Sequence, residues 1–207
     1  MIKFEVFSEE HDVRAKLDAL GLNLDGLIEV ADAAFAARDG ANENYPVNSP
    51  GTLAYHEGTA QLRVSFLSDS WKKARVDGVE CIENEQLQIR VVFSNVDQAA
   101  DLEVTPKPIT DKGQVTQVLC DTNSHQTSMD FGDEFEVKED NYLTYYMFVG
   151  EDGTAELSLP LACPSGKFKD LVERIVVLSS DDLDDDFIDD DEDDDGPEIE
   201  IEINRKI

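Results

Sequence analysis

A strand–turn–strand pattern near residue 150 sets the first limit on the fold of this chain. The segments YLTYYMFV (142–149) and AELSLPLA (155–162) have the composition of strands, and the residues between them include an Asp-Gly pair. Asp-Gly between two apolar runs is a strong hairpin signal. The pattern therefore predicts an antiparallel sheet. Pro160 places the second strand at an edge or close to its own end, because proline cannot donate a ladder hydrogen bond.

The remaining elements are expected to be helices first and strands afterwards. Apolar residues recur at helical spacing in three segments, and alternating or apolar runs predict further strands. The expected helices cover about 9–20, 25–37 and 53–67, and the expected strands cover 2–7, 79–82, 87–93, 114–120, 135–138 and 174–179. This order predicts an α+β fold over residues 1–180, with N-terminal helices followed by an antiparallel sheet built from hairpins.

The charge of the chain limits its partners. Forty-seven acidic and 17 basic residues give a net charge of −30. Residues 181–207 contain fifteen acidic and two basic residues, so the preceding 180 residues carry −17 without them. Direct binding to nucleic acid requires clustered Lys and Arg, and we expect none. A basic protein, or the basic site of an enzyme that handles nucleic acid, would be attracted instead.

Composition also indicates a compartment. The chain has no apolar run long enough to span a bilayer, its N-terminus lacks the pattern of a secretory signal, and its three cysteines are widely spaced. We expect a cytoplasmic protein with no membrane association, no disulfide framework and no cofactor.

One arrangement of side chains is compatible with catalysis. Glu136 and Lys138 lie two residues apart on the expected strand 135–138, and Asp121 follows the expected strand 114–120. Residues two apart share one face of a strand. The arrangement resembles the acidic-x-Lys core of restriction-endonuclease-like nucleases. The resemblance implies that Asp121 and Glu136 hold Mg²⁺ while Lys138 positions the attacking water. The alternative is a solvated strand face in an acidic sequence.

A second pattern concerns metal binding near the C-terminus. Asp191, Asp193, Asp195 and Gly196, followed by Glu202, match the spacing D-x-D-x-D-G-x₅-E. This spacing resembles the calcium loop of EF-hand proteins, which implies carboxylate ligands wrapped around one ion. The alternative is loose condensation of cations on a run of aspartates.

A third pattern predicts partner binding. The segment DDDFIDD (184–190) resembles the acidic tip of bacterial single-stranded-DNA-binding proteins, which implies docking onto a basic-rimmed apolar pocket. The alternative is a disordered acidic tail. The partner-binding residues expected from this pattern are Asp184, Asp185, Asp186, Phe187, Ile188, Asp189 and Asp190.

The last eleven residues differ from the acidic run before them. Ile199, Ile201 and Ile203 alternate with glutamates, the pattern of a strand that pairs with a sheet edge. We therefore expect a flexible acidic linker over 181–196 and a β-docking segment over 197–207, which can form a homo- or hetero-oligomer. We also expect that the acidic tail can fold back onto the basic cluster formed by Trp71, Lys72, Lys73 and Arg75. The alternative is that these three cations only make the surface soluble around one anchoring tryptophan.

The leading interpretation is a non-enzymatic interaction protein of a bacterial or phage type. It would bind a basic partner, as a DNA mimic that inhibits a nucleic-acid-handling enzyme. One alternative is an adaptor or subunit of a larger complex, assembled through its C-terminal strand. The other is the Mg²⁺-dependent nuclease built on Glu136 and Lys138.

Overall fold

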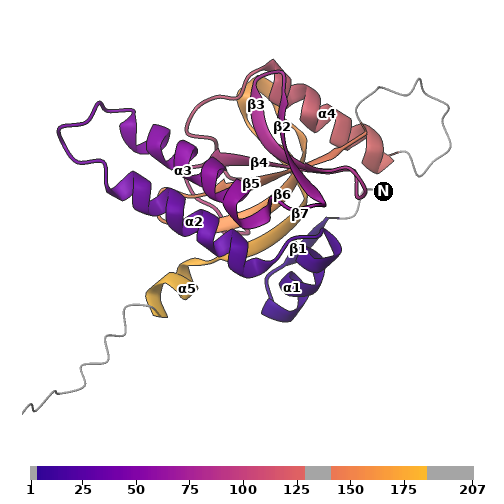
Figure 1. Ribbon diagram of the computed structural model, residues 1–207, viewed down its shortest axis with the longest axis horizontal. Coiled ribbons are helices and arrows are strands. Elements are labelled where there is room, and N and C mark those ends of the chain that lie inside the picture. Colours follow the sequence, from indigo (N-terminus) through magenta and orange to yellow (C-terminus); the bar gives the residue numbers. More distant parts are fainter. Residues whose placement is uncertain (1–3, 129–140, 186–207) are drawn as a thin grey trace, which may run out of the picture.

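The computed structural model describes residues 4–128 and 141–185. Figure 1 shows helices packed on both sides of one twisted sheet. The elements, in chain order, are β1 (Glu5–Phe7), α1 (Glu10–Ala19), α2 (Leu24–Asp39), α3 (Ser49–Phe66), β2 (Trp71–Val76), β3 (Val79–Asn84), β4 (Ile89–Asn95), α4 (Gln114–Ser128), β5 (Leu143–Val149), β6 (Ala155–Ala162), the 3₁₀ turn η2 (Pro164–Gly166), β7 (Lys169–Leu178) and α5 (Ser180–Asp185).

The sheet is mixed and has the strand order β1-β7-β6-β5-β4-β3-β2. The pairs β1–β7 and β4–β5 are parallel, and the other four pairs are antiparallel. The α+β class is thus confirmed, whereas a wholly antiparallel sheet is wrong. The parallel pair β4–β5 requires a crossover connection. The chain uses residues 96–142 for it, and this stretch includes α4.

Each face of the sheet has its own apolar core. On β5, Tyr145 and Met147 pack with α1, α2 and α3, whereas Tyr146 and Phe148 pack on the face that α4 covers. Successive residues of a strand point to opposite faces, so a strand covered on both faces is apolar throughout. This is why YYMFV reads as a continuous apolar run. The three layers are visible in Figure 1.

The hairpin expected between residues 142–149 and 155–162 is confirmed, and the expected strands 79–82 and 87–93 also form a hairpin. The strands β5 and β6 pair as antiparallel neighbours around the turn Gly150–Thr154, in which the Gly150 N–H donates to the Thr154 carbonyl at 2.8 Å. The strands β3 and β4 form the other hairpin. A third hairpin joins β2 to β3 through Asp77 and Gly78, which have φ of 46° and 97°. Two positive φ values are what a two-residue hairpin turn requires.

The expected strand 114–120 is wrong, because these residues begin α4. The buried residues Thr116, Leu119, Cys120 and Asn123 recur at helical spacing. Two of the four are polar, so the apolar pattern alone did not show the helix. The expected strand 135–138 lies outside the described residues.

The strand that contains Pro160 lies in the middle of the sheet, so the edge position is wrong, whereas the alternative of a place close to the strand's end is confirmed, since β6 ends two residues later at Ala162. The strand β6 pairs with both β5 and β7, and its register to β7 shifts between Leu159 and Pro160. Next to this irregularity, Asn123 of α4 inserts its amide between β5 and β6. The side chain accepts from the Thr144 N–H at 2.7 Å and donates to the carbonyls of Thr144 and Pro160 at 2.9 and 2.8 Å. A buried amide therefore supplies hydrogen bonds where the proline interrupts the ladder.

Candidate functional site

Most of the residues that the sequence singled out for chemistry lie outside the described part of the chain. Asp121 is an exposed residue of α4 and does not end a strand. The strand setting expected for it in a nuclease core is therefore wrong. Glu136 and Lys138 lie outside the described residues. Among the described residues, no group of three or more His, Cys, Asp or Glu side chains is placed to hold a metal ion.

The predicted acidic and β-docking segments are described only at their beginning. Asp184 and Asp185 belong to α5, a helix that starts inside the predicted domain and continues into the predicted linker. The residues that lie outside the described part are Asp186, Phe187, Ile188, Asp189, Asp190, Ile199, Ile201 and Ile203, together with Asp191, Asp193, Asp195 and Glu202 of the calcium-loop pattern.

The three N-terminal helices and their connections carry an excess of exposed carboxylates. The helix α2 shows how they are arranged, since Asp25, Glu29, Asp32 and Asp39 lie opposite the buried side that includes Leu27. At 1.5 Å per residue this row extends over about 21 Å. The exposed carboxylates, here called the acidic helical layer, are Glu9, Glu10, Asp12, Asp18, Asp25, Glu29, Asp32, Asp39, Glu43 and Glu57.

Every described cation of this layer is held in an ion pair. Arg14 contacts Glu10 at 2.8 Å and Asp25 at 3.2 Å, and Lys16 contacts Glu173 at 2.8 Å. The other two pairs join Arg38 to Glu151 and Arg63 to Glu80. Exposed pairs such as those of Arg14 contribute about 0–1 kcal/mol to stability. Their larger effect is that the layer presents carboxylates to solvent while its positive charges are neutralised within the protein.

The basic cluster identified in the sequence lies on β2, an edge strand of the sheet. Lys72, Lys73 and Arg75 are exposed, whereas the Trp71 ring is buried and its Nε1–H donates to the Gly21 carbonyl at 2.8 Å. Exposed lysines on an edge strand discourage pairing with other strands. They also provide a positive surface on a sheet edge that none of the described strands covers.

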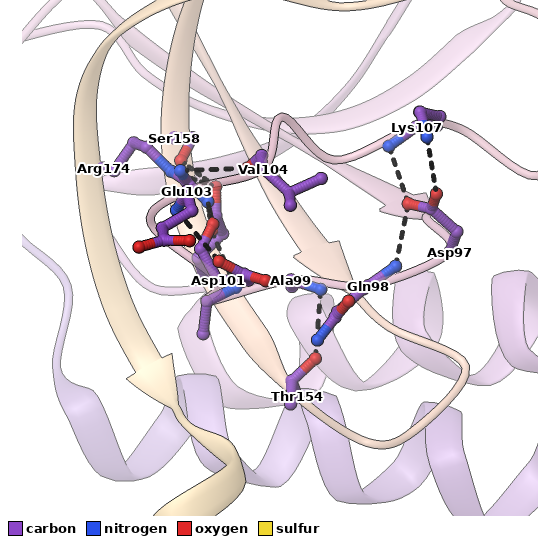
Figure 2. A network of polar contacts seen from close by, with 12 residues as sticks. Asp97, Gln98, Ala99, Asp101, Glu103, Val104, Lys107, Thr154, Ser158 and Arg174 are labelled. Carbon is purple, nitrogen blue, oxygen red and sulfur yellow. Dashed lines mark hydrogen bonds and ion pairs between the residues drawn. The ribbon is translucent and has the colours of Figure 1, made fainter.

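A network of buried polar groups fixes the loop that follows β4. Arg174 of β7 donates to Glu156 of β6 at 3.1 and 2.6 Å, and it also donates to the carbonyls of Asp101 and Val104 at 2.8 and 3.1 Å. Glu156 is fully buried and also accepts from the Ala100 N–H at 2.8 Å. Figure 2 shows Arg174 reaching the loop from the strand beside it.

Asp97 joins the beginning of the same loop to Lys107 further along it. Its carboxylate accepts from the N–H groups of Gln98 and Lys107, both at 2.8 Å, and the Ala99 N–H donates to the Thr154 hydroxyl at 3.0 Å (Figure 2). Because both ends of the loop are bonded to the sheet and its turns, the residues that follow it occupy a defined position. The Ile109 N–H, for example, donates to the Asn95 carbonyl at 3.3 Å.

This fixed loop forms one wall of a cleft of about 430 Å³. The cleft opens where the parallel strands β4 and β5 end, and the first turn of α3 forms the wall opposite the loop. Pockets that bind small molecules commonly measure about 300–1,000 Å³. The lining residues are Arg38, Val47, Asn48, Pro50, Gly51, Thr52, Tyr55, Asn95, Ile109, Thr110, Lys112 and Glu151. Sequence reasoning missed all of them, because they come from separate segments and share no motif.

Lys112 is the cation of the cleft that lacks a carboxylate partner among the described residues. Its backbone N–H donates to the Gly166 carbonyl at 3.1 Å, which fixes its position. Burial lowers the pKa of its ammonium group from 10.5 to about 8. Arg38, the other cation that lines the cleft, is paired with Glu151.

Comparisons of the chain with protein-family models, with curated proteins and with solved structures gave no match. In the described part of the chain, none of the helices combines the length and apolar character that a membrane span needs.

Proposed function

We propose that this chain is a non-enzymatic interaction protein that binds a basic partner through its acidic helical layer and mimics the DNA that this partner handles. The supporting observation is the excess of negative over positive side chains in that layer. Ten carboxylates are exposed on the helices and their connections, and the four described cations among them are each engaged in ion pairs. A basic surface that approaches this layer meets negative charge with no free positive charge to repel it.

The helix α2 gives the layer a linear element. Its four exposed acidic residues extend over about 21 Å, which is sparser than the one phosphate per ~3.4 Å of a DNA strand. A basic partner that tracks a DNA backbone would therefore contact α1 and α3 as well as α2. Such a surface attracts the partner electrostatically and offers no phosphodiester bond to cleave.

The test is capture of a partner from extracts of the source cells, followed by competition. The partner bound by wild type should be released by double-stranded DNA and by added salt, because charge dominates the contact. The triple variant Asp25→Asn, Glu29→Gln, Asp32→Asn should lose it.

A matched control removes the same number of charges elsewhere. Asp77, Glu85 and Asp170 are exposed and lie outside the helices. The variant Asp77→Asn, Glu85→Gln, Asp170→Asn should retain the partner. If the two triple variants lose the partner equally, or if DNA fails to compete, DNA mimicry by this layer is wrong.

A second candidate function is assembly through the C-terminal segment 197–207. The observation that favours it is the outer edge of β2, which carries Lys72, Lys73 and Arg75 and pairs with no other strand in the described part of the chain. In the sequence, Glu198, Glu200 and Glu202 alternate with the isoleucines and have the complementary charge. We propose that this segment of one copy adds to β2 of a second copy.

Light scattering coupled to size-exclusion chromatography tests this assembly. Wild type should be oligomeric, and both Ile201→Asp and the charge reversal Lys73→Glu with Arg75→Glu should be monomeric. Adding Glu198→Lys and Glu200→Lys to the reversed β2 should restore the oligomer. A monomeric wild type at a concentration of about 100 µM would contradict the proposal, because specific interfaces usually bind more tightly than that.

A further inference from the structure

We propose that the cleft between α3 and the loop 96–112 binds a small organic molecule through its phosphate or carboxylate group. This inference does not depend on the acidic helical layer, although Arg38 belongs to both the layer and the cleft. It rests on three properties of the cleft: its position in the sheet, the charges that line it, and the start of α3, where Asn48 makes no side-chain capping bond.

The position is a favourable one for a ligand. The strands β4 and β5 are parallel neighbours, and Asn95 and Glu151 lie at or just beyond their carboxyl ends. In sheets with parallel strands, ligands bind in the crevice outside the carboxyl ends, where loops and helix starts converge. The polar network around Arg174 holds the loop, so the cleft is formed before any ligand arrives.

The charges lining the cleft are unusual for this chain. In a protein with a net charge of −30, the cleft is lined by two cations and one carboxylate. The carboxylate, Glu151, is engaged by Arg38. Lys112 therefore contributes a positive charge that the described residues leave unneutralised, and its burial strengthens any contact with an anion because the local dielectric is lower than that of water.

The start of α3 supplies one hydrogen-bond donor on the same side, the Gly51 N–H, because the Ser49 N–H donates to the Pro46 carbonyl at 2.8 Å and Pro50 has no N–H. The N-cap residue Asn48 makes no side-chain capping bond, and the first turn contains no acidic residue. The Asn95 amide donates to the Gly51 carbonyl at 2.7 Å and so fixes this turn against β4. Helix starts favour anions because their first N–H groups lack partners within the helix.

The remaining lining determines what the anion is attached to. Tyr55, Ile109 and Val47 provide apolar surface around the charged end of the cleft. A volume of about 430 Å³ exceeds what an inorganic ion needs. A ligand with an anionic group and an apolar or aromatic body matches both parts of the lining.

The probes for the test are phenyl phosphate and inorganic phosphate, and phenol is the uncharged comparison. Titration of the full-length protein, followed by amide NMR shifts, should give saturable binding of phenyl phosphate with shifts concentrated at Gly51, Asn95 and Lys112. Inorganic phosphate should bind at the same residues at least about fivefold more weakly, and phenol should not saturate.

Two variants separate the cleft from the rest of the surface. Lys112→Met should weaken phenyl phosphate binding at least tenfold, as expected for loss of a charge-assisted contact, whereas Lys167→Met, an exposed lysine outside the cleft, should leave it unchanged. Asn48→Asp places a carboxylate at the start of α3. A negative charge at a helix start interacts favourably with the helix dipole, so this variant should keep its thermal stability or gain some while losing the ligand.

Ionic strength gives an independent readout. The overall negative charge repels the anion at long range, and salt screens long-range terms first. Affinity for phenyl phosphate should therefore stay constant or rise with added sodium chloride, whereas binding of a basic partner to the acidic helical layer should fall. Absence of saturable binding, equal binding by Lys112→Met or by Asn48→Asp, or a steep loss with salt would each overturn the proposal.

Discussion

Replacing Arg174 by Met should destabilise the protein strongly, because it leaves a carboxylate buried without its counter-charge. The change deletes two hydrogen bonds to Glu156 and one each to the carbonyls of Asp101 and Val104. Glu156 has no exposed surface, so water cannot replace the guanidinium there. The two loop carbonyls are at the less buried end, where water can replace the lost donor.

The size of the expected destabilisation is set mainly by the buried carboxylate of Glu156. Removing one partner of a buried ion pair costs about 3–5 kcal/mol. That is a large part of the about 5–15 kcal/mol by which a domain of ordinary size is stable. Urea unfolding of Arg174→Met should therefore show a free energy of unfolding lower by about 3–5 kcal/mol. Lys169→Met, an exposed change on the same strand, should stay within about 0.5 kcal/mol of wild type.

A double variant tests the reasoning itself. Combining Arg174→Met with Glu156→Leu removes the uncompensated charge of Glu156. The double variant should therefore be more stable than Arg174→Met alone by at least about 1 kcal/mol. Amide exchange at Ala99 and Ala100 should accelerate in Arg174→Met before exchange in α2 does, because the network fixes this loop. A loss below about 1 kcal/mol, or additive effects in the double variant, would refute the argument.

Three further predictions concern single positions. Asn123→Leu should lower the free energy of unfolding in urea by about 3–5 kcal/mol, because the N–H and C=O of Thr144 and the Pro160 carbonyl lose their hydrogen-bond partner. A loss under about 1 kcal/mol would contradict the bridging role of Asn123. Gly58→Ala should destabilise the protein by more than about 1 kcal/mol in thermal unfolding, because the added methyl group would overlap the Phe93 ring. This loss should exceed the gain from the better helix propensity of alanine. An unchanged melting temperature would show that the ring can move away. Lys112→Met should be about 3 kcal/mol more stable than wild type at pH 7, because the lowered pKa of Lys112 means that folding disfavours its charged form. Between about pH 8 and 10.5 the folded protein releases the Lys112 proton while the unfolded chain keeps it, so wild type gains stability as pH rises. The difference in free energy of unfolding between Lys112→Met and wild type should therefore shrink over this range. A difference that does not change with pH would contradict the burial of this ammonium group.

Local signals in the sequence were sufficient to predict the helices and hairpins whose pattern lies within one short segment. The helices α1, α2 and α3 have apolar stripes at helical spacing, and the β5–β6 hairpin has its Asp-Gly turn. The same turn chemistry was available at Asp77 and Gly78, and it would have predicted the β2–β3 hairpin.

The parts that could not be predicted depend on distant contacts or on buried polar residues. The helix α4 buries Thr116, Thr122 and Asn123, so a reading of apolar residues alone could not find its buried side. Pro160 predicted an edge strand or a place close to the strand's end. The sequence could not show that an outside group, the amide of Asn123, completes the hydrogen bonding around it in a central strand. Neither the parallel β4–β5 pair nor the cleft at its end follows from any local pattern.

The pairing of β1 with β7 has a consequence for the synthesis of this chain. Glu5, Val6 and Phe7 are in register with Glu173, Arg174 and Ile175, a separation of 168 residues. During translation the first strand therefore has no partner until nearly the whole domain has emerged. The helices α1, α2 and α3 also emerge before the strands that cover their apolar sides. Long-range contacts of this kind slow folding and prolong the exposure of apolar surface. We expect the nascent chain to occupy chaperones for longer than a helical protein of the same length.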